Sequence, residues 1–103
     1  MQFRRVGTMA FLGGYTKATK DVPPFMIADG LDVQIRGFNK IGMERRGVSE
    51  QSRNAVKQAY RILYRKKLSL PEALEMIENE VEQTPEIQHL LNFIRSSEQG
   101  IVR

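Results

Sequence analysis

The sequence contains no cysteine, no tryptophan and one histidine, His89, among its 103 residues. Without cysteine the chain can form no disulfide, no thiolate nucleophile and no cysteine-ligated zinc or iron–sulfur site. A single histidine also excludes a cluster of histidine ligands and a cysteine–histidine pair. We therefore expect neither a metal site nor a cofactor.

Long hydrophobic runs are absent as well. No apolar stretch approaches the ~20 residues that a membrane-spanning helix needs, and the first residues lack the apolar core of a secretory signal. The content of 41% hydrophobic and 27% charged residues is typical of a globular protein, and the length suits one small domain. We expect a cytoplasmic, reducing location.

Charge is distributed unevenly along the chain. The net charge is +4, but residues 44–67 carry eight basic and two acidic side chains, whereas residues 68–103 carry two and seven. A compact basic block is a candidate docking surface for an anionic partner.

The first segment repeats a small or aliphatic residue every six positions, at Val6, Leu12 and Ala18. This spacing indicates either one coil of a left-handed β-helix or an ordinary glycine-rich hairpin, and a lone coil would leave one edge unpaired. Two prolines, at 23 and 24, end the segment. Short strands are predicted over 25–28 and 32–36, on either side of a turn at Asp29 and Gly30.

The rest of the chain predicts helices separated by short linkers, which favour antiparallel neighbours in a compact bundle. Capping residues and apolar spacing place them at 39–46, 50–66, 69–83 and 85–97. The expected apolar stripes are Ala55, Val56, Ala59, Tyr60 and Leu63; Leu70, Leu74, Ile77 and Val81; and Ile87, Leu90, Leu91 and Ile94.

A basic ridge lies on the helix predicted over 50–66, with one cation every four residues: Arg53, Lys57, Arg61 and Arg65. It is either the solvated face of an amphipathic helix or a docking surface. Like charges at this spacing repel one another, and no acidic residue stands between 53 and 67 to relieve them. The partner would be a small acidic protein or a nucleic acid, although no motif that reads DNA or RNA is present.

Two other sets of polar residues have alternative interpretations. His89 falls away from the apolar stripe of its helix, so we expect a solvated residue without a catalytic role. Arg45 and Arg46 either close the helix over 39–46 or bind phosphate, which planar guanidinium groups hold with two hydrogen bonds.

Several motifs together resemble the C-terminal part of the UDP-N-acetylglucosamine O-acyltransferases, which catalyse the first step of lipid A biosynthesis. They are DVPP at 21–24 with ADG at 28–30, GFNKIGMERRG at 37–47, the stretch from AY at 59 to YR at 64, and GIVR at 100–103. The resemblance covers nearly the whole chain. It implies a homotrimer in which a β-helix precedes a helical domain, and transfer of a 3-hydroxyacyl group from acyl carrier protein to the sugar nucleotide.

The resemblance also assigns roles to individual residues. Gln2, Asn39, Arg45 and Arg46 match positions that handle the nucleotide substrate, and the basic ridge matches a surface that receives the carrier protein. No catalytic residue is expected here, because no position of this chain matches the family's general-base histidine. The chain departs from the family pattern at Met1, Ile41 and Glu44.

These observations predict an α+β chain: a terminal coil of a left-handed parallel β-helix with short exit strands over 1–37, then a compact, mainly helical C-terminal domain over 38–103. The leading hypothesis is a C-terminal acyltransferase domain that contributes carrier-protein docking, nucleotide contacts and trimer contacts, and is inactive alone. The alternative is a free-standing basic helical module that binds acyl carrier protein or nucleic acid.

Overall fold

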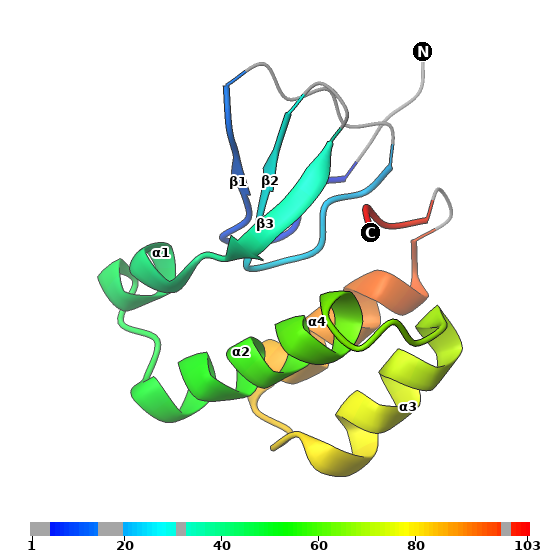
Figure 1. Cartoon of the computed structure of the whole chain (residues 1–103). Helices are drawn as coiled ribbons and strands as arrows, with labels where there is room; N and C mark the ends of the chain where they lie inside the picture. Colours follow the sequence, from blue (N-terminus) through cyan, green and yellow to red (C-terminus); the bar gives the residue numbers. More distant parts are fainter. Residues whose placement is uncertain (1–4, 15–19, 31–32, 98–99) are drawn as a thin grey trace.

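A computed structural model of the chain has two parts, a small β-sheet and a group of helices beneath it (Figure 1). This arrangement confirms the predicted α+β class. The residues that the structure describes are 5–14, 20–30, 33–97 and 100–103.

The sheet has three strands in the order β1, β2, β3. Strand β1 (Phe11–Leu12) runs parallel to β2 (Met26–Asp29), and β2 runs antiparallel to β3 (Gln34–Phe38). The two strands expected around Asp29 and Gly30 are therefore present, displaced by one or two residues. Gly30 has a φ of 98°, which the turn can adopt because glycine has no Cβ.

The first segment returns parallel to itself at a constant offset. Val6 faces Val22 and Phe11 faces Ile27, so each partner lies sixteen residues further along the chain. A fixed parallel offset is what one turn of a coil produces, which supports the interpretation of the six-residue spacing. Ala18, the third position of that spacing, lies outside the described residues.

The aliphatic residues of this coil are not enclosed. Val6 is 48% exposed and Leu12 is 41% exposed, whereas a residue in the shaft of a β-helix is buried. Units of a repeat architecture bury their apolar faces by stacking on one another. A single coil has no such cover, so these two side chains contact solvent.

The helices begin where the capping residues predicted. Their bounds are α1 Lys40–Arg45, α2 Glu50–Tyr64, α3 Leu70–Glu80 and α4 Pro85–Arg95. Ser49 and Thr84 accept hydrogen bonds from amides of the first turns of α2 and α4, and Ser69 forms the expected capping box. Helices α2, α3 and α4 end two or three residues earlier than the sequence predicted. The backbone reverses at Lys67, which has a φ of 54°.

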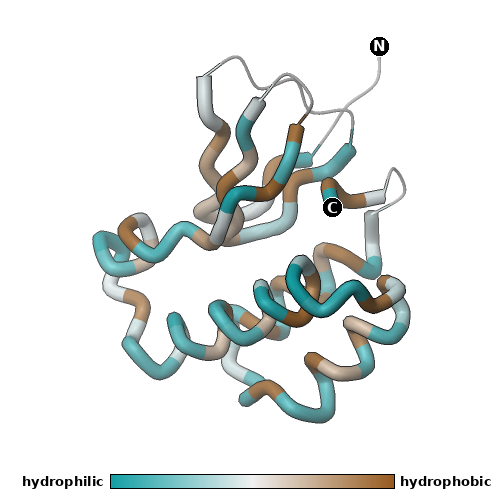
Figure 2. Tube along the Cα trace, in the orientation of Figure 1, coloured by the Kyte–Doolittle hydropathy of each residue, from teal (hydrophilic) through white to brown (hydrophobic). Residues whose placement is uncertain are grey.

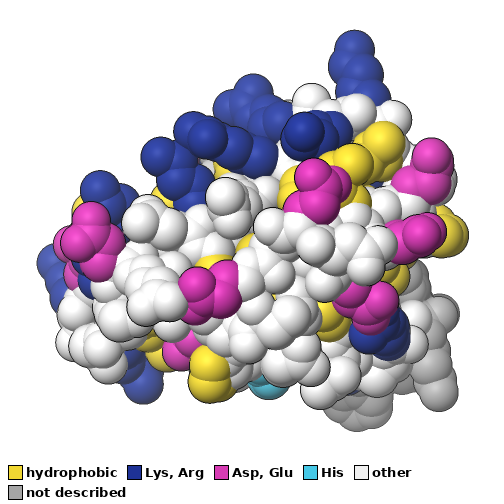
Figure 3. Space-filling model, turned by 90° about the horizontal axis from the view of Figure 1, so that it is seen from below, with side chains coloured by type: hydrophobic (Ala, Val, Ile, Leu, Met, Phe, Trp, Pro, Cys, Tyr) yellow, Lys and Arg dark blue, Asp and Glu magenta, His cyan; other side chains and the backbone are white. Residues whose placement is uncertain are grey.

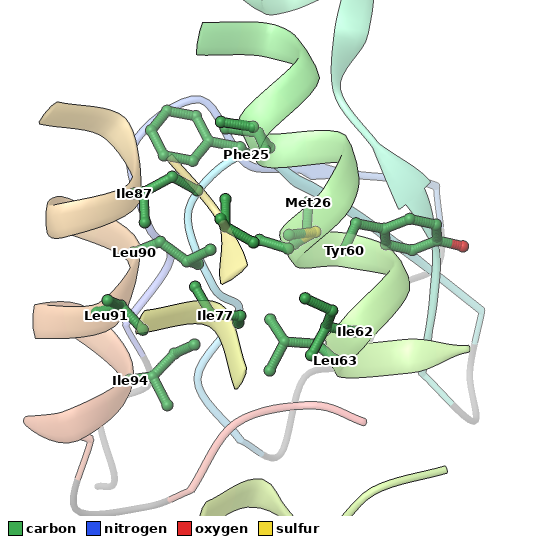
Figure 4. Packing of buried hydrophobic residues seen from close by; sticks show 14 of the residues in the cluster. Phe25, Met26, Tyr60, Ile62, Leu63, Ile77, Ile87, Leu90, Leu91 and Ile94 are labelled. Carbon is green, nitrogen blue, oxygen red and sulfur yellow. The ribbon is translucent and has the colours of Figure 1, made fainter. Parts of the chain in front are cut away.

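The core forms where α2, α3 and α4 meet the lower end of the sheet. In Figure 4 the apolar side chains of α4 point toward Ile77 of α3 and Leu63 of α2, and Phe25 and Met26 reach the same cluster from the start of β2. Hydrophobic and hydrophilic residues alternate in short blocks along these helices (Figure 2), as one buried side requires.

The predicted stripes agree with this core except on α3. Every predicted residue of α2 and α4 is buried. On α3, Leu70 and Leu74 are only partly buried, whereas Ala73, which was not predicted, is completely buried. A small residue at this point lets α3 approach the core closely, so the stripe is narrower than expected.

Candidate functional site

Asn39 ties the start of helix α1 to neighbouring segments by hydrogen bonds, and Met43 of the same helix is completely buried in the core. The backbone N–H of Asn39 donates to the carbonyl of Phe25 at 2.6 Å, and its side-chain amide donates to the carbonyl of Met9 at 2.9 Å. Its Oδ1 accepts from the amide of Gly42 at 3.0 Å and caps the helix. Both polar atoms of the side chain are thus used within the protein. Gly42 is necessary here because a Cβ would lie 2.3 Å from the Asn39 Nδ2.

Arg45 and Arg46 project from the end of α1. Both are exposed, and neither guanidinium forms a hydrogen bond or ion pair with a residue that the structure describes. Gly47 then ends the helix with a φ of 79°, as predicted. Ile41, on the same helix, is 62% exposed. The structure thus brings Asn39, Arg45 and Arg46 onto one short element, whereas Gln2 lies outside the described residues.

The basic ridge on α2 starts at a residue with intramolecular partners. Arg53 is half-buried, its Nη1 donates to the carbonyl of Val48 at 2.6 Å, and its Nε lies 3.8 Å from the Glu44 Oε1. The lack of acidic residues between 53 and 67 therefore does not leave Arg53 uncompensated. Glu44 of α1 supplies the opposite charge in space rather than along the helix.

The other three cations of the ridge are exposed but face different hollows. Lys57 lines a hollow of about 150 Å³ between α1 and α2, together with Glu44 and Glu50. Arg61 lines one of about 200 Å³ between α2 and α3, near Glu80. Arg65 instead faces β3. In Figure 3 the Lys and Arg side chains gather along one edge of the helical face, with Asp and Glu spread over the rest.

The sequence did not indicate an ion pair between Arg5 and the buried Asp21, two residues that also bond to the end of α4 and to Ser97. The Asp21 carboxylate, 2% exposed, accepts from the Arg5 amide at 2.9 Å, the Arg5 Nε at 3.2 Å and the Ser97 hydroxyl at 2.7 Å. Burial alone raises the pKa of Asp21, but these three donors outweigh it, so the pKa of this carboxyl lies below its usual range. The sequence showed only an acid before two prolines, which gives no sign of this role.

His89 is exposed, as expected, and also makes contacts that the sequence did not suggest. Its Nε2 lies 3.0 Å from the Thr8 Oγ1, and its ring packs against the edge of Phe25, with centroids 6.2 Å apart. These contacts connect α4 to the first segment. Within the described residues there is no group of three His, Asp or Glu side chains placed to hold a metal ion, and no helix could cross a membrane.

Comparison with known proteins gives a consistent result. The family described as Udp N-acetylglucosamine O-acyltransferase, domain 2, matches residues 21–102. The acyl-[acyl-carrier-protein]--UDP-N-acetylglucosamine O-acyltransferase of Anaeromyxobacter sp. strain Fw109-5 is 40% identical over 102 residues, which are 99% of this chain and 40% of that relative.

Solved structures agree with the sequence comparison. LpxA, a UDP-N-acetylglucosamine acyltransferase from Bacteroides fragilis, superimposes with a TM-score of 0.96 at 41% identity, over all of this chain and 40% of that one. The Arabidopsis UDP-N-acetylglucosamine acyltransferase gives a TM-score of 0.88 at 30% identity, over all of this chain and 39% of that one. The chain thus spans about 40% of the length of these relatives, and it belongs to the UDP-N-acetylglucosamine O-acyltransferase family.

Proposed function

We propose that this chain acts as the C-terminal region of an acyltransferase of lipid A biosynthesis. In that enzyme an acyl group passes from acyl carrier protein to UDP-N-acetylglucosamine. The relatives' names give the acyl donor and the acceptor. The observation that carries the proposal is the position of Arg45 and Arg46, which extend without partners among the described residues from a helix that Asn39 fixes to the sheet.

In this proposal the nucleotide contacts come from α1 and from Gln2. The two exposed guanidinium groups of α1 would hold the phosphates of the nucleotide. Asn39 would act mainly as a positioning residue, because its side-chain oxygen and amide already bind Gly42 and Met9.

Titration of the chain with UDP-N-acetylglucosamine tests the nucleotide contacts. The variants Arg45→Gln and Arg46→Gln should each weaken binding by roughly tenfold, since a charged hydrogen bond contributes about 1.5–3 kcal/mol when buried and less at the surface. Lys20→Gln, which removes an exposed cation distant in sequence from α1, is the matched control. Equal weakening in all three variants would show only a general charge effect and would contradict the proposal.

Carrier-protein docking is assigned to the ridge, and Lys57 and Arg61 are the members best suited to a test because Arg65, also exposed, faces β3 instead. Arg53 is a poor choice for a test because its guanidinium supports the carbonyl of Val48 and pairs with Glu44. Charge reversal by Lys57→Glu and Arg61→Glu should abolish most binding to acyl carrier protein at low salt, with Lys20→Glu as the control. Unchanged binding in the double variant would refute the docking role.

The remaining parts of the proposal are trimer formation, a cytoplasmic location and inactivity of the chain alone. His89, the one histidine of the sequence, contacts Thr8 and Phe25 rather than the arginines at α1, so it does not lie beside the proposed nucleotide contacts. An acyl-transfer assay giving turnover above background would contradict the predicted inactivity. Light scattering after size-exclusion chromatography measures whether the chain forms the trimer.

A further inference from the structure

A second basic site lies beside the C-terminal end of α2. It is a hollow of about 470 Å³ between β3, the end of α2 and the last residue of the chain. We call it the basic groove and define it by its charged and aromatic side chains: Arg36, Tyr60, Tyr64, Arg65, Lys67 and Arg103.

The basic groove differs from the other hollows in its charge. Its four cations come from three separate parts of the chain, and no acidic residue is among its lining residues. The hollow beside Lys57 contains two glutamates and the one beside Arg61 contains one. Acidic side chains therefore compensate the cations less here than in the other two hollows, and a concave basic surface concentrates positive potential.

Three of the four cations of the groove already have contacts within the protein. The Arg103 Nη2 donates to the carbonyls of Leu63 and Leu68 at 2.8 and 3.0 Å, and the other N–H groups of this guanidinium have no partner among the described residues. The Arg36 Nη1 donates to the Gln34 Oε1 at 3.2 Å. The Arg65 guanidinium stands 5.9 Å from the centre of the Tyr60 ring. Fixed donors lose little conformational entropy on binding, which favours affinity.

The two tyrosines contribute one further donor. In Figure 4 the Tyr60 hydroxyl points out of the core cluster, and it has no hydrogen-bond partner among the described residues. The Tyr64 hydroxyl already donates to the carbonyl of Val102 at 2.7 Å. Burial raises the pKa of Tyr64, so this hydroxyl stays protonated and keeps that bond. Only the Tyr60 hydroxyl remains available to a ligand.

We propose that the basic groove binds a small soluble phosphate ligand, an organic diphosphate or a related phosphate ester. Guanidinium groups hold phosphate oxygens with paired hydrogen bonds, and a phenol hydroxyl adds a neutral donor to the same oxygens. The volume lies within the range of about 300–1,000 Å³ that is usual for small-molecule sites. This site contains no residue of α1, so it is independent of the nucleotide contacts proposed above.

Two neighbouring lysines provide a matched pair for the test. Lys67 lines the basic groove, whereas Lys66 lines the hollow between α2 and α3. We would titrate the ¹⁵N-labelled chain with inorganic pyrophosphate and follow its amide resonances. Saturable shifts should be largest at the amides of Arg36 and of residues 64–67. Lys67→Gln and Arg36→Gln should each raise Kd by roughly fivefold, and Lys66→Gln by less than twofold.

Three outcomes would overturn the proposal. They are shifts that do not saturate, equal weakening by Lys66→Gln and Lys67→Gln, and binding only to phosphatidylcholine vesicles that contain phosphatidic acid. Arg45→Gln separates this site from the one proposed on α1, because it should leave the groove shifts unchanged. A loss of UDP-N-acetylglucosamine binding with intact groove shifts would thus concern α1 alone.

Discussion

Replacement of Asp21 by asparagine should destabilise the chain by about 2 kcal/mol at neutral pH. A hydrogen bond to a charged group contributes about 1.5–3 kcal/mol, and the Asp21 carboxylate accepts two from side chains, from the Arg5 Nε and the Ser97 hydroxyl. Removal of one partner from a fully buried pair costs about 3–5 kcal/mol. We expect less because the Arg5 side chain is 45% exposed and its charge stays in contact with water.

The pH dependence identifies the charge as the cause. The pKa of Asp21 is lowered in the folded state relative to about 3.9 in the unfolded chain, so the ionised form stabilises the fold. This contribution is complete above the unfolded pKa and is lost as the pH falls through the folded pKa. The difference in unfolding free energy between the wild type and Asp21→Asn should therefore shrink below about pH 4.

Urea denaturation at a series of pH values measures both effects. At pH 7 the variant should also melt roughly 10 °C lower, since about 1 kcal/mol corresponds to about 4–8 °C in a domain of this size. Glu75→Gln removes an exposed acid and is the control, with an expected change within about 0.5 kcal/mol. If Asp21→Asn resembles Glu75→Gln at pH 7, or if its deficit persists unchanged at pH 2, the reasoning is wrong.

Three further changes test the packing. Gly7→Ala should destabilise by about 1–3 kcal/mol in urea unfolding, because its Cβ would lie 2.3 Å from the backbone nitrogen of Pro24; Gly14→Ala, with nothing within 4 Å, should not. Leu90→Ala should cost about 2–5 kcal/mol in the same assay, since Leu90 is 0% exposed, and a smaller loss would mean that the core collapses around the cavity. Thr84→Ala should cost about 1–2 kcal/mol and lower the helical circular dichroism, since it removes the cap of α4; unchanged stability would contradict that role.

The helices were predictable from the sequence because their signals are local. A serine or threonine cap, an acidic residue in the first turn and apolar spacing lie within one segment, and they placed the starts of α2, α3 and α4 correctly. The end of α2 was less predictable. The chain adopts a positive φ at Lys67, soon after this helix ends, and lysine rarely adopts that conformation.

The parts that sequence reasoning missed depend on residues far apart in the chain. Asp21 accepts hydrogen bonds from Arg5, sixteen residues away, and from Ser97, seventy-six residues away. No local sequence pattern indicates such long-range contacts. The basic ridge shows the same limit, because Glu44 reaches Arg53 only through the turn between α1 and α2. The four-residue spacing predicts one continuous ridge, whereas Lys57, Arg61 and Arg65 line three separate hollows, and only the structure shows this division.

The attachment of α1 has a consequence for how ligand affinity is set. A helix of six residues is too short to be stable by itself, so α1 depends on the burial of Met43 and on the three hydrogen bonds that Asn39 makes to Phe25, Met9 and Gly42. If these bonds open together, both arginines of α1 lose their orientation at once. Affinity at this helix would then be governed by a local folding equilibrium as well as by charge. Hydrogen exchange at the amides of Asn39 and Gly42 would report the stability of the binding-competent state directly.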